Sequence, residues 1–146
     1  MANKYSEYFQ INENYFPCVD LEAIRAGAPW TNTYPHDAFI TLLRCVERML
    51  SGGIHPVWIH GAYGTGKSQC AYALKKILEV PEQELRDYWN KEAYSHVLQT
   101  NTNKDLLEKL IGHKSRNIVT AYRYASGGID GVHSLLLAVQ DTILWR

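Results

Sequence analysis

The apolar residues of this chain recur at helical spacing in five stretches. In the first, residues 35–50, Pro35 suits an opening turn and Ser51-Gly52-Gly53 ends the pattern. Its apolar stripe consists of Phe39, Leu42, Leu43, Val46, Met49 and Leu50. Because residues three and four apart share one face of a helix, the spacing predicts an amphipathic helix here.

Four later stretches repeat this pattern with varying clarity. Residues 69–78 place Ala71, Leu74, Ile77 and Leu78 on one face, and Pro81 opens a less clearly amphipathic stretch over roughly 82–97. Thr102 and Asp105 resemble a capping box, which predicts the start of another helix. The apolar stripe of this helix is formed by Leu106, Leu107, Leu110 and Ile111, and Gly112 is expected to end it. A last helix is predicted from Val132, Leu135, Leu136, Val139 and Ile143.

Two short runs are rich in β-branched and aromatic residues. Residues 57–60 begin Val-Trp-Ile, and residues 118–125 run from Ile118 to Ala125. Such runs bounded by turn residues are typical of strands. Helices alternating with apolar strands predict an α/β fold for residues 35–146.

Residues 1–34 have a different composition, with many aromatic residues and turn formers. We predict an N-terminal arm that packs onto the α/β domain. Its rings Tyr8, Phe9, Tyr15 and Phe16 are expected to be mostly buried.

The segment Gly61-Ala62-Tyr63-Gly64-Thr65-Gly66-Lys67-Ser68 spells a complete P-loop, or Walker A motif, between a predicted strand and a predicted helix. Glycines let the backbone approach a pyrophosphate closely, and consecutive N–H groups at a helix start form an anion nest. Lys67 is expected to reach the β- and γ-phosphates, and the Ser68 hydroxyl to ligate Mg²⁺. The alternative is a glycine-rich turn with an incidental Lys-Ser pair, but all fixed positions match, so we predict a nucleoside triphosphate site.

Composition narrows the class of protein without naming a substrate. The 146 residues carry fifteen basic and fifteen acidic side chains, so charge gives no support to nucleic-acid binding. Three widely spaced cysteines are typical of reduced thiols, and no run of about eighteen apolar residues could span a bilayer. These features predict a cytoplasmic protein that does not bind membranes.

The Gly64–Ser68 core, preceded by a predicted helix and strand, resembles the AAA+ and related ATPase branch of the P-loop NTPases, over about residues 35–80. More loosely, the arm and residues 118–144 resemble large prokaryotic phage-defence ATPases of bacteriophage-exclusion type. The resemblance implies a three-layer α/β/α core, ATP rather than GTP, and Mg²⁺. It also makes Tyr34, Pro35 and His36 candidate contacts for the adenine base, although they could equally just start a helix.

Hydrolysis in that branch needs a strand ending in Asp-Glu, and only residues 135–141 come near it. Gln140 interrupts the apolar run, Thr142 stands in the place of Glu, and a parallel strand there would need a longer crossover, so a helix is favoured. Such ATPases also use an arginine finger, an arginine that stabilises charge in the transition state. Arg116 and Arg123 are available for this role, but only their charge supports the assignment. We therefore expect this chain to contain the phosphate-binding loop but not the residues that hydrolysis requires.

Within 146 residues the P-loop strand would have no neighbouring strand, which is a liability for a soluble protein. We therefore expect the rest of a larger protein, or another subunit, to complete the sheet. The first predicted function is an ATPase module that couples hydrolysis to remodelling, translocation or signalling. The alternative is a non-hydrolysing, nucleotide-dependent switch or interaction domain. A small-molecule phosphotransferase is less favoured because no arginine-rich lid is visible.

Overall fold

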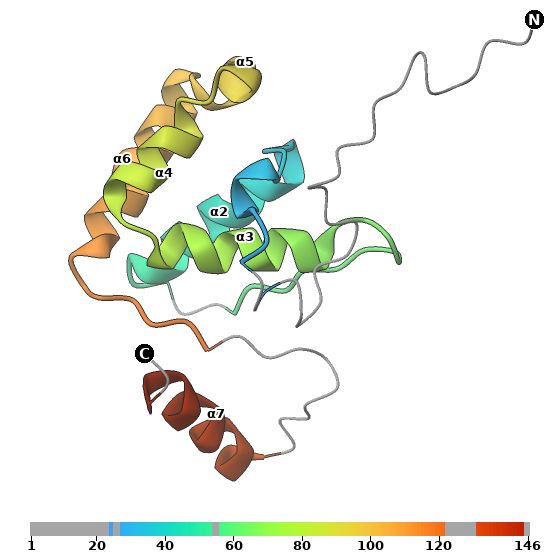
Figure 1. Ribbon diagram of the computed structural model, residues 1–146, viewed down its shortest axis with the longest axis vertical. Coiled ribbons are helices and arrows are strands. Elements are labelled where there is room, and N and C mark those ends of the chain that lie inside the picture. Colours follow the sequence, from blue (N-terminus) through green and yellow to red (C-terminus); the bar gives the residue numbers. More distant parts are fainter. Residues whose placement is uncertain (1–23, 25–26, 54–55, 122–130, 145–146) are drawn as a thin grey trace, which may run out of the picture.

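The computed structural model describes residue 24 and residues 27–53, 56–121 and 131–144. Within these residues the chain forms six α-helices, two short 3-10 helices and no β-strand (Figure 1). In chain order they are η2 (Trp30–Asn32), α2 (Asp37–Leu50), α3 (Lys67–Glu79), α4 (Glu82–Trp89), η3 (Glu92–Tyr94), α5 (Ser95–Leu98), α6 (Asn101–Lys114) and α7 (Val132–Leu144).

The predicted α/β fold, with its three-layer α/β/α core, is therefore wrong for the part of the chain that the structure describes. Residues 56–60 lead into the loop without pairing to a strand, and the Trp58 side chain is 88% exposed. Residues 117–121 are equally irregular, and the rest of the second predicted strand lies outside the described residues. A β-prone sequence becomes a strand only when a neighbour accepts its backbone hydrogen bonds, and neither run has one among the described residues.

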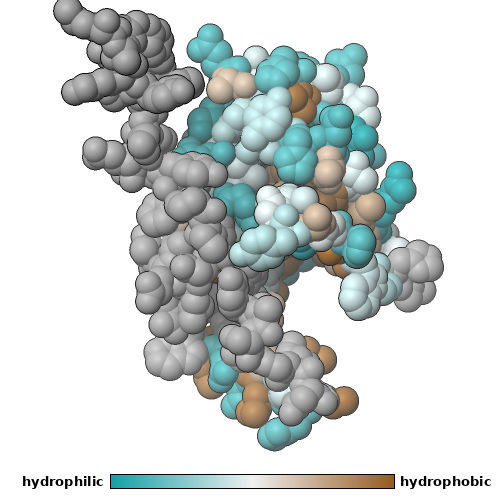
Figure 2. All heavy atoms as spheres, turned by 90° about the vertical axis from the view of Figure 1, so that its right-hand side faces the viewer, coloured by the Kyte–Doolittle hydropathy of each residue, from teal (hydrophilic) through white to brown (hydrophobic). Residues whose placement is uncertain are grey.

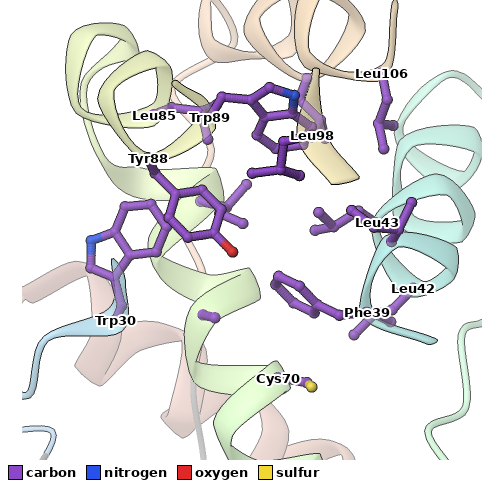
Figure 3. Close-up of a cluster of buried hydrophobic side chains, with 14 of the residues drawn as sticks. Trp30, Phe39, Leu42, Leu43, Cys70, Leu85, Tyr88, Trp89, Leu98 and Leu106 are labelled. Atoms are coloured by element: carbon purple, nitrogen blue, oxygen red, sulfur yellow. The ribbon is translucent and has the colours of Figure 1, made fainter. Parts of the chain in front are cut away.

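Helix α6 is central to the packing because it contacts α2, α3, α4 and α5. The core between these helices is apolar and rich in aromatic side chains, as the close-up in Figure 3 shows. Its most completely buried large side chains include Leu43, Tyr72, Leu85, Trp89 and Leu98. Burying such side chains stabilises the fold by about 1.5–3 kcal/mol each, which is enough to order a helical body without a sheet.

Three helix predictions are confirmed, and three predicted boundaries are wrong. The stripes over 35–50, 69–78 and 132–143 form helices α2, α3 and α7. The stretch predicted at 82–97 is broken into α4, η3 and α5. Helix α6 begins one residue before Thr102, with Thr100 as an N-cap whose side chain makes no capping bond, and it runs through Gly112 to Lys114.

The C-terminal end of α3 is capped by a lysine from another helix. The Lys114 Nζ of α6 donates to the carbonyls of Ile77, at 2.8 Å, and Val80, at 2.6 Å. Burial lowers the pKa of Lys114, while the charges of Glu84 and Glu82 oppose that shift. Continuing α6 past Gly112 places this ammonium group where the last carbonyls of α3 need a donor, which favours the longer helix.

Residues 28–34 form a segment anchored to the helices by its own carbonyl groups. The hydroxyl of Tyr72 donates to Ala28 O at 2.9 Å, and that of Tyr88 to Thr33 O at 2.8 Å. Thr31 O accepts from both Lys91 and Tyr94. Trp30, in the same segment, is buried against Tyr88 with ring centroids 4.9 Å apart. This end of the predicted arm is thus part of the core, whereas Tyr8, Phe9, Tyr15 and Phe16 lie outside the described residues.

Helix α7 contributes no side chain to this core cluster. Ala138 is buried, but most of the large apolar residues of α7 are exposed. Hydrophobic surface accordingly gathers at the lower end of the view in Figure 2. Across the described ranges, no helix combines the length and the apolar character needed to cross a membrane.

Candidate functional site

The loop Gly61–Ser68 has a backbone that only glycine accommodates at several positions. Gly64 and Gly66 adopt φ angles of 79° and 78°, in the left-handed region that side chains with a Cβ disfavour. At Gly61, a Cβ atom would lie 3.0 Å from the Thr65 Oγ1. The φ angles therefore favour glycine at Gly64 and Gly66, a Cβ at Gly61 would be in tight contact, and α3 starts immediately after Gly66.

Two side chains of the loop bond back to its own carbonyls. The Thr65 hydroxyl donates to Ala62 O at 2.8 Å. The Lys67 Nζ donates to Gly61 O at 2.8 Å and also to Ala62 O. The ammonium group is thus held inside the curve of the loop, where its donors satisfy carbonyls until a stronger acceptor arrives.

A cavity of about 280 Å³, which we call the loop pocket, joins this loop to the start of α2. Its volume is at the lower end of the range of ligand pockets, about 300–1,000 Å³. Gly61, Thr65 and Lys67 form its polar end, and His36 and His60 stand at its wall. The apolar part is formed by Ala38, Leu42, Ile59 and Cys70.

His36 is fixed in one orientation by its position at the start of α2. It is the N-cap residue, and its Nδ1 accepts the backbone N–H of Phe39 at 3.2 Å. An accepting Nδ1 leaves the proton of the neutral ring on Nε2. That Nε2 lies 3.7 Å from the Cys70 Sγ.

Cys70, on the first turn of α3, gives His36 only a weak partner. Burial raises the pKa of the Cys70 thiol, so the sulfur stays protonated near neutral pH. A thiol sulfur is a poor hydrogen-bond acceptor compared with oxygen or aromatic nitrogen. The Nε2–H of His36 is therefore a donor at the pocket wall whose present partner is easily exchanged.

Of the three residues suggested as base contacts, only His36 lines the loop pocket. Tyr34 points elsewhere, with its hydroxyl 2.9 Å from the Nε2 of His96, and Pro35 is buried in the protein interior. His60, at the end of the predicted strand, does line the pocket. In the loop itself, Ala62, Tyr63, Gly64 and Ser68 are exposed and lie outside the pocket lining.

Four residues of the loop pocket could not be assigned to a ligand site from the sequence: Ala38, Leu42, Ile59 and Cys70. Leu42 belongs to the apolar stripe of α2, which alone indicates a core position. The only available signal was spacing, because Cys70 lies one helical turn after Lys67 and therefore on the same face of α3.

Asp141 and Arg116, the suggested hydrolytic residues that the structure describes, do not line the loop pocket. Asp141 lies on α7, a helix and not a strand, so residues 135–141 are no acidic strand. Arg116 donates to Leu50 O at 2.9 Å, where it helps to end α2. Arg123 lies outside the described residues. No group of three or more His, Cys, Asp or Glu side chains in the described ranges is arranged to hold a metal ion.

Comparison with known proteins adds no relative to this picture. No protein-family model, curated protein or solved structure matches the chain.

Proposed function

We propose that residues 61–68 bind the phosphate chain of a nucleoside triphosphate, ATP in the first instance. The observation that carries this proposal is the loop geometry. Two glycines with left-handed φ angles, and a third where a Cβ would be in tight contact with Thr65, lead into the N-terminus of a thirteen-residue helix. Backbone N–H groups at such a turn favour anions, and the helix dipole adds to the effect.

Lys67 supplies the main charge for this interaction. Its ammonium group now bonds two loop carbonyls, and a β- or γ-phosphate is a stronger, charged acceptor. Exchanging one set of acceptors for the other requires only rotation of the side chain. The carbonyls released in this step are exposed, so water can satisfy them.

Ser68 is the residue that fits Mg²⁺. It is exposed on the first turn of α3, directly after Lys67, so its hydroxyl can reach an ion held by the same phosphates. Bound Mg²⁺ would neutralise phosphate charge there. With one hydroxyl as protein ligand, the ion would depend on phosphate oxygens and water for the rest of its shell, as Mg²⁺ commonly does.

The base of the nucleotide is proposed to enter the loop pocket. The apolar wall formed by Ala38, Leu42 and Ile59 suits the faces of an aromatic ring, and the polar end is the P-loop itself. The volume of about 280 Å³ suits one ring system and leaves the phosphates outside, along the exposed loop.

Binding without turnover is the form of this function that the described residues favour. Among the described residues, no carboxylate lines the loop pocket, and Asp141 belongs to a helix. A nucleotide-dependent switch or interaction domain is therefore preferred for these residues. An ATPase role that couples hydrolysis to remodelling, translocation or signalling, in phage defence or elsewhere, stays a prediction. It would draw its acidic group from another subunit or from the remainder of a larger protein.

The test is calorimetric titration of Mg-ATP into the wild-type chain and the Lys67→Ala variant. We expect Lys67→Ala to weaken binding at least about tenfold, since a charge-assisted bond contributes about 1.5–3 kcal/mol. Its melting temperature should be unchanged because the side chain is bonded only to exposed loop carbonyls. Lys104→Ala, at an exposed position of α6, is the matched control and should bind as wild type. Wild-type affinity in Lys67→Ala would overturn the proposal.

Ser68→Ala separates the metal from the phosphates. It should weaken Mg-ATP more than ATP with a chelator present, because only the first complex uses the hydroxyl as a metal ligand. Equal losses in both titrations would remove Ser68 as the Mg²⁺ contact while leaving the P-loop assignment in place.

A further inference from the structure

We propose that His36 determines base specificity, by donating its Nε2–H to a ring nitrogen of a purine held in the loop pocket. This inference rests on the proposed nucleotide function and adds to it the group that recognises the base. The observations that carry it are the fixed tautomer of His36, its place on the pocket wall and the weakness of its present partner.

The tautomer makes His36 a donor toward the pocket. Because Nδ1 accepts the Phe39 N–H, a neutral ring presents N–H and no lone pair at Nε2. A base nitrogen with a free lone pair therefore matches this position, while a base N–H does not. Adenine presents such nitrogens at N1, N3 and N7, and guanine only at N3 and N7, so the donor favours purine nucleotides and selects adenine over guanine only through N1.

Transfer of the His36 Nε2–H from the Cys70 sulfur to a base nitrogen is favourable because the bond to the sulfur is weak. Its thiol accepts only at 3.7 Å and is protonated, so a base nitrogen at ordinary hydrogen-bond distance would bind the same proton more strongly. The polar lining groups Thr65 and Lys67 are both engaged with carbonyls of the loop. On the wall that α2 contributes, the one polar side chain is His36.

His36 has two roles that one substitution can separate. Its Nδ1 caps α2, and its Nε2 lies 3.7 Å from the Sγ of Cys70, which also lines the pocket. In His36→Asn, the side-chain oxygen can still cap the helix, since Asn is among the best N-cap residues. Asn is too short to place a donor where Nε2 lies. His36→Asn should therefore keep the melting temperature of the wild type, and His36→Ala should lower it.

The experiment measures the affinities of ATP and its 1-deaza, 3-deaza and 7-deaza analogues for the wild type and for His36→Asn. We expect one analogue to bind the wild type about threefold to tenfold more weakly than ATP, the effect of one hydrogen bond. In His36→Asn, ATP itself should fall to the level of that analogue, so the difference between them disappears. His133→Asn, on exposed α7, is the matched control and should keep the wild-type ratios.

Inorganic tripolyphosphate distinguishes this inference from the proposed function. It should bind His36→Asn as tightly as wild type, because it has no base, and should be lost in Lys67→Ala. Wild-type affinity of His36→Asn for ATP, or unchanged ratios for all three analogues, would overturn the role of His36 and leave the P-loop function standing. An equal loss of tripolyphosphate in His36→Asn would also overturn it, since His36 would then act through the loop.

Discussion

The hydrogen bond from the Tyr88 hydroxyl to Thr33 O is predicted to stabilise the packing of residues 28–34 against the core. The ring is 2% exposed, and the hydroxyl donates to Thr33 O at 2.8 Å. Tyr88→Phe would leave that carbonyl buried without a partner among the described residues. A buried unsatisfied polar group costs about 1–3 kcal/mol, so we expect the free energy of unfolding to fall by that amount. For a chain of this length the melting temperature should fall by about 3–9 °C.

Tyr94→Phe is the matched control for this prediction. Its hydroxyl reaches Thr31 O at a longer distance, 3.3 Å, and the same carbonyl keeps the Lys91 Nζ at 3.0 Å. No carbonyl is left alone, so we expect a loss below about 0.5 kcal/mol. Urea denaturation of both variants is the assay. Equal losses in the two variants, or a Tyr88→Phe midpoint equal to wild type, would refute the reasoning.

Three further predictions follow from other contacts. Burial alone would raise the pKa of Glu79, but bonds from Lys75 and Thr120 outweigh it and hold the pKa below its ordinary value of 4.5. The stability that the lowered pKa of Glu79 contributes is complete above pH 4.5 and is lost as the pH falls through the folded-state pKa. Glu79→Gln should therefore flatten the decrease of unfolding free energy at acid pH, measured by urea denaturation. An unchanged pH profile would contradict this prediction. Gly112→Ala, within α6 and with open space around its Cβ, should raise unfolding free energy by about 0.5–1 kcal/mol; a decrease would contradict a continuous helix. Phosphate release from ATP should stay at background, and steady turnover that Asp141→Asn eliminates would restore a catalytic role for that residue.

Local pattern predicted the helices that have one clear apolar face. The stripe of Phe39, Leu43 and Val46 is buried as expected, and α2 ends at Leu50. Pattern failed where a distant group decided the outcome. Gly112 would end an isolated helix, yet Lys114 caps α3 and the helix continues. The strand-like residues Val57 to Ile59 carry the right propensities, but no neighbouring strand in the described ranges pairs with them.

The candidate site was predictable in its loop and not in its pocket. Glycine spacing and the Lys-Ser pair are local, so residues 61–68 could be found from the sequence, and the φ angles at Gly64 and Gly66 agree with the demands of such a loop. The pocket wall depends on α2 meeting α3. His36 was suggested as a base contact only by the resemblance to AAA+ ATPases. Its fixed tautomer depends on an N-cap hydrogen bond that propensity does not predict, because His is not a favoured N-cap residue.

The anchoring of residues 28–34 also sets an order of events during synthesis. Thr33 precedes its partner Tyr88 by 55 residues, and Thr31 precedes Tyr94 by 63. At a translation rate of about 5–20 residues per second, the segment waits on the order of 3–12 s for these donors to be made. Ribosome-bound chains stalled before residue 88 should therefore remain open to protease at residues 28–34, and longer chains should become protected once α4 and η3 have emerged.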